Sequence, residues 1–116
     1  MEPTQKDRVK FVYLVGKLLT WIEQQKLEVT FGDAYRNPKF SREQLGDNNS
    51  YFHEWSFHCK RCAIDLNLFR NGELVSRSED YKAIGDFWKS LDKMCSWGGD
   101  FSHAPDGDHY SVLEGK

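Results

Sequence analysis

Cysteine is scarce in this sequence, and no apolar run is long enough to cross a membrane. The 116 residues include three cysteines, an odd number, which favours free thiols in a reducing compartment over a disulfide framework. A membrane-spanning helix needs about 20 consecutive apolar residues, but Lys17, Glu23 and Asp86 interrupt the longest apolar stretches. We therefore expect neither a disulfide-stapled fold nor a membrane partner.

An excess of charge of one sign is also missing. The chain has 16 Lys and Arg against 18 Asp and Glu, a formal net charge of -2, which argues against electrostatic binding of nucleic acid. Residues 1–8 mix both signs and no apolar stretch follows them, so we expect synthesis in the cytoplasm without a signal peptide. No repeat, low-complexity run or linker divides residues 1–116, which predicts one domain.

Two segments have the apolar periodicity of an amphipathic helix. The first covers about 7–27, and its apolar positions are Phe11, Leu14, Val15, Leu18, Leu19 and Ile22. The second covers about 78–95, and its apolar side consists of Tyr81, Ile84, Phe87, Trp88, Leu91 and Met94. Residues 33–56 are rich in Asn, Pro, Gly, Asp and Ser, which predicts a loop with one short helix near 41–45.

A strictly alternating segment at 62–69 predicts a strand with one apolar face, which carries Ile64, Leu66 and Leu68. The Asn-Gly pair at 71–72 is typical of a two-residue hairpin turn, so 73–75 should return as a partner strand. Shorter strands are expected at 27–31 and 109–112. Together these elements predict an α+β fold, a small antiparallel sheet flanked by amphipathic helices.

An acidic residue, Asp65, stands in the middle of the predicted strand at 62–69. An ionised carboxylate there is costly unless a cation or hydrogen-bond donors meet it. His58 precedes it by seven residues, and a histidine with a carboxylate is a ligand pair that Zn²⁺ accepts. The alternative is that Asp65 binds loop amides and His58 lies on the surface.

The segment 97–110 gathers two histidines and three aspartates among glycines. A catalytic zinc usually has three protein ligands, and the third fits His109 better than His103, because His109 opens a predicted strand. Asp106 precedes His109 by three residues and is suited to take a proton from the attacking water. The alternative is a glycine-rich turn with solvated aspartates.

Two stretches of sequence resemble the motifs of one enzyme family. Residues 56–66, Ser-Phe-His-Cys-Lys-Arg-Cys-Ala-Ile-Asp-Leu, resemble the S-x-H-x-x-G-x-A-x-D motif of zinc peptidases that cut peptidoglycan stem peptides. Trp-Gly-Gly-Asp-Phe at 97–101, followed by Asp-Gly-Asp-His-Tyr at 106–110, resembles W-G-G-D-W and D-x-x-H-F of the endolysin-like branch. This family includes D-alanyl-D-alanine carboxypeptidases and L-alanyl-D-glutamate endopeptidases, and its fold is shared with hedgehog domains.

The resemblance implies a role for each matching residue. Asp106 would be the catalytic acid and base, beside a Zn²⁺ ion whose ligands would be His58, Asp65 and His109. Arg36, in Tyr-Arg-Asn at 35–37, would bind the substrate and stabilise the oxyanion, a role that suits a guanidinium; a plain surface salt bridge is the alternative. Ser56 would support a ligand or contact the substrate. Trp55 and Trp97 stand in loops beside the two motifs and are expected to line the cleft and contact the substrate; packing under the active-site loops is the alternative.

Two features depart from the family motif. Arg61 stands where the motif has glycine, which puts the loop path near the metal in question. Cys59 and Cys62 form a C-x-x-C pair, for which a structural zinc site with His53, or a redox pair, is an alternative reading. A structural zinc needs four ligands, and no second pair of suitable spacing follows.

The resemblance implies a zinc metallopeptidase that hydrolyses an amide bond in the peptidoglycan stem peptide. The form of the second motif favours the L-Ala–D-Glu endopeptidase of a phage endolysin. Alternatives are a D-Ala–D-Ala carboxypeptidase using the same residues, and a non-catalytic binding module stabilised by its metal. We expect a monomer without a separate wall-binding domain, which reaches the cell wall through a phage holin-type pore.

Overall fold

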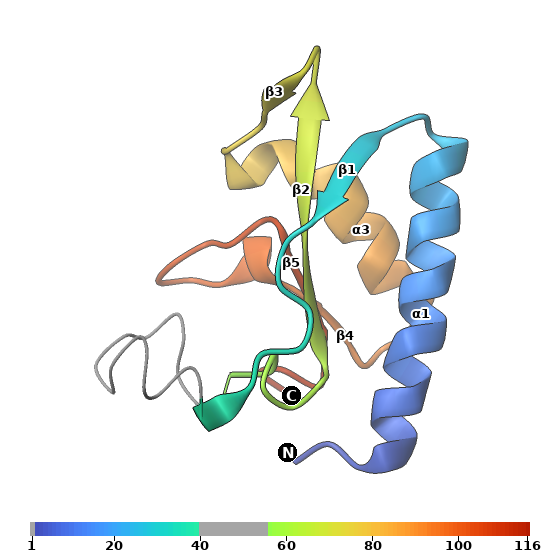
Figure 1. Cartoon of the computed structure of the whole chain (residues 1–116), viewed down its shortest axis with the longest axis vertical. Coiled ribbons are helices and arrows are strands. Elements are labelled where there is room, and N and C mark those ends of the chain that lie inside the picture. The colour runs from blue at the N-terminus through green and yellow to red at the C-terminus, as the bar shows by residue number, and fades with distance from the viewer. Residues whose placement is uncertain (1, 40–55) are drawn as a thin grey trace.

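The computed structural model describes residues 2–39 and 56–116 (Figure 1). In chain order, its elements are α1 (Gln5–Gln24), β1 (Glu28–Phe31), β2 (Ala63–Arg70), β3 (Glu73–Leu74), the 3₁₀ turn η1 (Ser78–Tyr81), α3 (Lys82–Leu91), β4 (Cys95–Trp97), the 3₁₀ turn η2 (Gly98–Asp100) and β5 (His109–Val112). The predicted helix at 41–45 lies outside the described residues, as do His53 and Trp55. No helix in the described ranges is both long and apolar enough to cross a membrane.

α1 starts at a capping box that the periodicity alone does not reveal. The Thr4 hydroxyl accepts a hydrogen bond from the Asp7 amide, and the Asp7 carboxylate accepts one from the Thr4 amide. Two backbone donors at the helix start are thereby satisfied, which is why the helix begins before the predicted residue 7. It ends at Gln24, shortly before Lys26 turns the chain with a φ of 58°.

The strands form an antiparallel sheet in the order β1-β2-β5-β4, with β3 also paired to β2. The α+β class with a small antiparallel sheet is therefore confirmed. The predicted helix at 78–95 is too long, because its first four residues form η1 and α3 ends at Leu91. Asp92 is extended, with a φ of -164°, and its carboxylate accepts a hydrogen bond from the Met94 amide. This local bond ends the helix, and Cys95 starts β4 instead.

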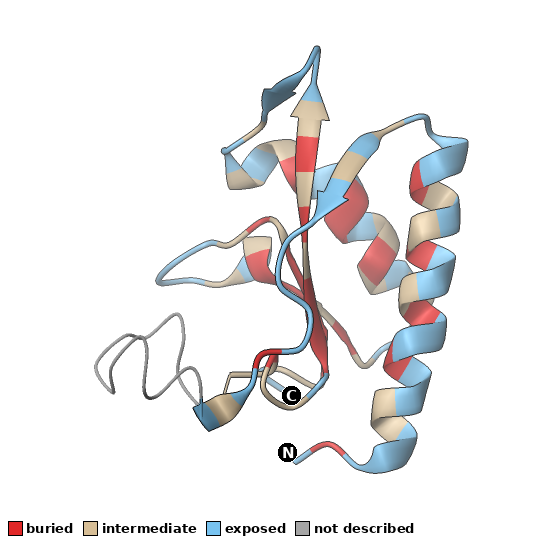
Figure 2. Ribbon diagram, in the orientation of Figure 1, coloured by how far each residue is buried: buried red, intermediate tan, exposed pale blue. Residues whose placement is uncertain are grey.

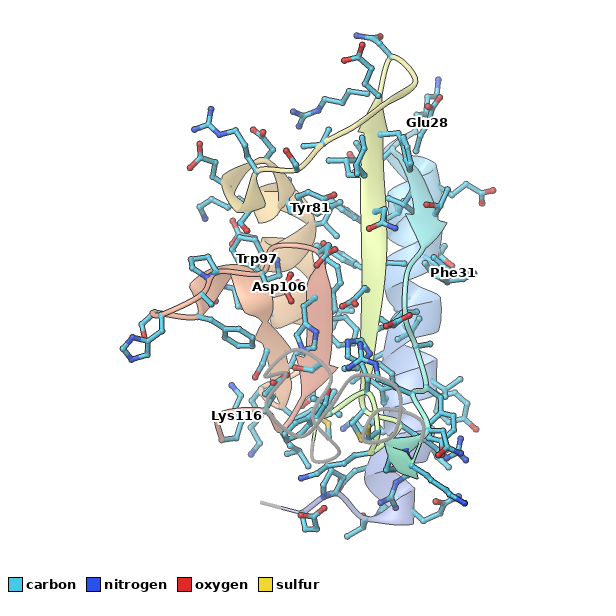
Figure 3. The ribbon with its side chains drawn as sticks, turned by 60° about the vertical axis from the view of Figure 1, so that its left-hand side comes forward. Glu28, Phe31, Tyr81, Trp97, Asp106 and Lys116 are labelled. Carbon is cyan, nitrogen blue, oxygen red and sulfur yellow. The ribbon has the colours of Figure 1, made fainter. Side chains whose placement is uncertain are left out.

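β2 runs through the middle of the sheet, and α1 and α3 pack on one face of that sheet (Figures 1, 2 and 3). Its alternate side chains Ile64, Leu66 and Leu68 are buried, as the sequence predicted. They pack with the apolar faces of α1 and α3 in one cluster that includes Leu18, Trp88 and Tyr110. The opposite parity of β2 carries Asp65, which is therefore directed away from the helices.

Tyr81 provides a test of how η1 is joined to the sheet. Its hydroxyl donates a hydrogen bond to the Val75 carbonyl at 2.7 Å and accepts one from the Leu68 amide at 2.9 Å. Tyr81→Phe leaves both backbone groups unpaired, so we expect it to lower the free energy of unfolding by about 1–3 kcal/mol. Urea unfolding measures this loss. The control is Tyr13→Phe at an exposed position of α1; equal midpoints for the two variants would contradict this role of the hydroxyl.

Candidate active site

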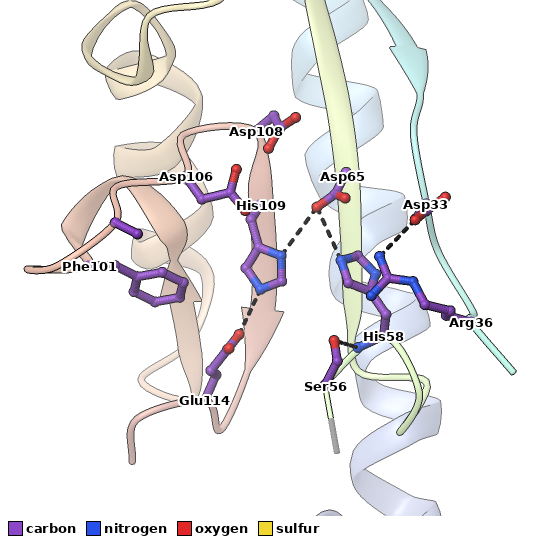
Figure 4. A pocket seen from close by; sticks show the side chains of 11 residues that line it. Asp33, Arg36, Ser56, His58, Asp65, Phe101, Asp106, Asp108, His109 and Glu114 are labelled. Carbon is purple, nitrogen blue, oxygen red and sulfur yellow. Dashed lines mark hydrogen bonds and ion pairs between the residues drawn. The ribbon is translucent and has the colours of Figure 1, made fainter. Parts of the chain in front are cut away.

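Asp65 and His109 are directly opposed across β2 and β5. Opposed residues of an antiparallel pair project to the same face, so both side chains meet on the side of the sheet away from the helices. His109 Nδ1 lies 3.2 Å from Asp65 Oδ1. His58, in the turn before β2, places its Nε2 3.2 Å from the same oxygen. The three residues thus converge on one point, drawn in Figure 4.

The outer nitrogen of each histidine has its own hydrogen-bond acceptor. His58 Nδ1 lies 2.9 Å from the Ala34 carbonyl oxygen, which has no proton to give, so this nitrogen carries the hydrogen. His109 Nε2 lies 2.6 Å from Glu114 Oε1. With these hydrogens on the outer nitrogens, the inner nitrogens face the Asp65 carboxylate, and they become ligand atoms when a metal takes the place of any proton between them. Such a set of three donors is what a divalent cation needs.

Hydrogen bonds between Asp65 and the two histidines shift the pKa values of this centre. Burial alone raises the pKa of Asp65, but hydrogen bonds from His109 and His58 outweigh burial and lower that pKa to about 2. Burial has the opposite effect on His109 and lowers its pKa. The hydrogen bonds to Asp65 and Glu114 outweigh this effect and raise the pKa to about 10. Without a cation between them, these groups therefore hold a proton. A metal that binds here must displace that proton.

A second pair of carboxylates, Asp106 and Asp108, forms the neighbouring wall. Their oxygens and one of Asp65 all lie within 4.8 Å of one another. Burial, a hydrogen bond with Asp106 and the charges of Asp106 and Asp65 raise the pKa of Asp108 well above its usual range. Two carboxylates this close favour a shared proton. The raised pKa thus favours a protonated Asp108 beside Asp106 and the predicted metal ligands.

Arg36 reaches the site from the segment that follows β1. Its side chain is buried, and its Nη2 donates a hydrogen bond to Asp33 Oδ2 at 2.7 Å. Its backbone amide donates to the His58 carbonyl at 3.2 Å, which ties this segment to the turn carrying the histidine. Ser56 Oγ accepts the His58 amide at 3.2 Å. Both predicted residues therefore lie at the site.

These side chains line one open cavity of about 480 Å³. The predicted residues on its wall are Arg36, Ser56, His58, Asp65, Asp106 and His109. Further lining residues that the sequence did not single out are Asp33, Phe101, Ala104, Asp108 and Glu114. Figure 4 shows the two walls, one formed by the segment from Phe101 to Glu114 and the other by β2 with the turns beside it.

Trp97 does not line this cavity, so its predicted contact with substrate is not found. The indole is buried, and its Nε1 donates a hydrogen bond to the Gly107 carbonyl at 2.7 Å. Its ring leaves no room for a side chain at Gly85 or Gly99, where a Cβ would lie 2.2 Å away. Trp97 therefore supports the loop of Asp106 and Asp108 from the core, because an apolar ring of this size is best accommodated there.

Arg61 keeps the loop path that glycine provides in the family motif. Its φ is 61°, a left-handed conformation that glycine adopts at no cost and other residues adopt at some cost. Its guanidinium lies 3.7 Å from the centre of the Tyr35 ring, and such cation–π contacts are stabilising. The departure from the motif therefore leaves the histidine turn in place.

The alternative zinc site of Cys59 and Cys62 involves His53, which lies outside the described residues. Cys59 is half-buried and Cys62 is fully buried. Within residues 2–39 and 56–116, neither group of potential ligands includes a cysteine. Burial raises the pKa of Cys62, which makes its thiol a poor nucleophile and ligand.

Comparison with known proteins places the chain in a family. A family model described as D-alanyl-D-alanine carboxypeptidase matches residues 52–112. The chain belongs to this family. Among solved structures, the L-Ala D-Glu endopeptidase ChiX of Serratia marcescens is similar, with a TM-score of 0.70 and 18% sequence identity over 89% of this chain and 77% of that one. No curated protein sequence matches the chain. The suspected family and the hedgehog/DD-peptidase-like fold are thus confirmed.

The D-alanyl-D-alanine carboxypeptidase family match covers residues 52–112, and three cavity residues lie outside it: Asp33, Arg36 and Glu114. Asp33 precedes the match, and its place three residues before Arg36 is a signal that sequence reasoning passed over. Glu114 follows the match. Asp108 lies inside the second motif, but the D-x-x-H pattern leaves its position open. Asp33, Asp108 and Glu114 do not stand at ligand positions of the two motifs, so only the fold reveals that they meet at the site.

Gly98 provides a test of how the Asp106 loop is seated. The Asp106 amide donates to the Gly98 carbonyl at 2.9 Å, and a Cβ on Gly98 would lie 2.1 Å from the Asp106 carbonyl oxygen. Gly98→Ala must displace this backbone, so we expect a loss of about 1–3 kcal/mol in unfolding free energy. Gly16→Ala is the control, because Gly16 lies in α1 with nothing near its Cβ, and we expect a gain of about 0.5–1 kcal/mol. Thermal unfolding of both variants checks the opposite signs, and the same sign for both would refute this packing.

Proposed function

We propose that this chain is a zinc-dependent endopeptidase that cleaves the L-Ala–D-Glu bond of the peptidoglycan stem peptide. The observation that carries the proposal is the convergence of His58 Nε2 and His109 Nδ1 on Asp65 Oδ1, each at 3.2 Å. Membership of a peptidase family supports peptide hydrolysis. The fold similarity to an L-Ala D-Glu endopeptidase supports the choice of bond.

The donor set fits zinc. Two imidazoles and one carboxylate are a common protein ligand set of catalytic zinc, and they leave a position open. Both histidines donate their outer N–H to an acceptor, an arrangement typical of zinc ligands. When bound by His58, Asp65 and His109, zinc supplies a Lewis acid that polarises the scissile carbonyl and lowers the pKa of a water molecule towards neutrality.

Asp106 moves the proton in this proposal. Its carboxylate faces the same cavity as the three ligands and accepts a proton from the attacking water as the oxygen bonds to the carbonyl carbon. When the C–N bond breaks, Asp106 returns that proton to the amine nitrogen and is ready for the next cycle. The raised pKa of Asp108 supports this role, because a protonated Asp108 donates a hydrogen bond to the Asp106 carboxylate and keeps a proton next to it.

Arg36 stabilises the negative oxygen that develops on the scissile carbonyl. A guanidinium in a partly desolvated cavity interacts more strongly with such an oxygen than it would in water. The bond to Asp33 holds one edge of the group at 2.7 Å, which limits the rotamers available to a long side chain. We propose a binding role for Phe101 as well, because its ring lies beside His109 on the cavity wall, with 5.8 Å between ring centres.

A D-Ala–D-Ala carboxypeptidase is the second candidate, and the description of the matching family model favours it. The same ligands and the same base serve either bond. A non-catalytic module is less well supported, because Asp106 and all three ligands face one cavity. We keep the release through a phage holin-type pore, and action on the cell wall as a monomer, as parts of the proposal.

Digestion of purified peptidoglycan, followed by mass spectrometry of the released fragments, tests the function. Endopeptidase activity gives stem peptides that begin at D-Glu, whereas carboxypeptidase activity removes a terminal D-Ala. A chelator should abolish either activity, and added Zn²⁺ should restore it. Loss of terminal D-Ala alone would replace the first candidate by the second, and no cleavage by the zinc-loaded protein would contradict both.

Asp106→Asn tests the base in the same assay. The amide has the shape of the carboxylate but does not accept the proton, so we expect the rate to fall by about 10²–10⁴-fold while zinc content stays at that of the wild type. Asp86→Asn is the matched control, because Asp86 is exposed on α3 and paired with Lys82. A fully active Asp106→Asn variant would show that another group is the base.

A further inference from the structure

The chain reverses direction directly after β5. Leu113 has a φ of 67°, a left-handed conformation that is rare and costly for a bulky side chain. Its amide donates a hydrogen bond to the Met94 carbonyl at 2.8 Å, and the Ser96 hydroxyl donates to the Glu114 carbonyl at 2.7 Å. Two bonds to the segment around β4 therefore hold the reversal, and they fix the backbone of Glu114 beneath the site.

The reversal brings the Glu114 carboxylate back to His109. Glu114 Oε1 accepts the His109 Nε2 hydrogen at 2.6 Å, and the two side chains are 26% and 7% exposed. Figure 4 shows this bond on the side of the imidazole opposite Asp65. A short hydrogen bond to an ionised acceptor in a mostly buried place is stronger than a neutral one.

The two histidines of the site differ in the group that accepts the hydrogen of their outer ring nitrogen. His58 donates to a neutral acceptor, the Ala34 carbonyl, and that acceptor belongs to the backbone. His109 donates to a carboxylate on a side chain. A carboxylate acceptor increases the basicity of the imidazole more than a carbonyl does, and it fixes which ring nitrogen carries the hydrogen.

We infer that Glu114 is a positioning residue for the metal centre: it holds the Nε2–H of His109, so that Nδ1 faces Asp65 and is the nitrogen that binds the metal. This inference rests on the proposed zinc site, and it concerns a residue two positions beyond the family match at 52–112. The left-handed turn at Leu113 places the Glu114 carboxylate next to the His109 ring.

Zinc affinity without substrate tests this role. The purified apoprotein competes with a chromogenic chelator for Zn²⁺, and the variants are Glu114→Ala, Glu114→Gln and the control Glu73→Gln on exposed β3. We expect affinity to fall about 10- to 100-fold in Glu114→Ala, to fall less in Glu114→Gln because its amide oxygen still accepts the hydrogen, and to stay unchanged in the control. In the zinc-loaded protein, the proton resonance of His109 Nε2–H should lie at low field in the wild type, as expected for a hydrogen bond to a carboxylate, and should shift upfield in Glu114→Ala.

The outcomes separate this inference from the proposed function. Wild-type zinc binding together with equal affinity and the same Nε2–H resonance in Glu114→Ala would overturn the inference and leave the function standing. Failure of the wild type to bind zinc would overturn both. If Glu114→Ala does not fold, which its circular dichroism spectrum reveals, Glu114→Gln decides: its affinity must lie below that of the wild type, and equality contradicts the inference.

Discussion

The pairing of Asp65 with His109 across β2 and β5 determines the direction of both side chains. In a strand, a shift of register by one residue exchanges the two faces. Such a slip would oppose Asp65 to a neighbour of His109 and separate the carboxylate from the imidazole. The buried neighbours Ile64 and Tyr110, which are also opposed, hold the register from the core side. The packing of the core and the assembly of the site therefore depend on the same set of contacts.

The site has an outer layer of bonds that comes from elements distant in sequence. Ala34 and Asp33 come from the segment after β1, and they hold His58 and Arg36. Glu114, after β5, holds His109. Trp97 supports the loop of Asp106 through Gly107. Bringing several ionisable side chains together costs charge repulsion and lost hydration. Backbone groups, neighbouring carboxylates and a buried aromatic ring hold these side chains in place.

Much of this arrangement follows from the sequence, and the remainder does not for definite reasons. The alternation at 62–69 predicted that Leu66 is buried and that Asp65 points away from it, because side chains of a strand alternate between faces. A local sequence pattern does not determine which strands pair or in which register. Only the fold therefore reveals that Asp65 lies opposite His109. The helix at 78–95 was predicted too long, because apolar spacing continues through Met94 although Asp92 ends the helix.

Position relative to the cavity was the hardest property to predict. Trp97 stands in a glycine-rich segment typical of cleft loops, yet its ring fills the core, because Gly85 and Gly99 make room for it. Glu114 was passed over because its role depends on a left-handed residue, Leu113, in a position where no glycine marks the turn. Arg61 likewise takes a positive φ without being glycine. Backbone conformations that non-glycine residues rarely adopt leave no signal in composition or periodicity.

We propose that His58, Asp65 and His109 bind one metal ion, and anomalous diffraction from zinc-soaked crystals tests this binding most directly. We expect one strong zinc peak in contact with His58 Nε2, Asp65 Oδ1 and His109 Nδ1, present above the zinc absorption edge and absent below it. A peak at Cys59 and Cys62, or one between Asp106 and Asp108 without either histidine, would contradict it.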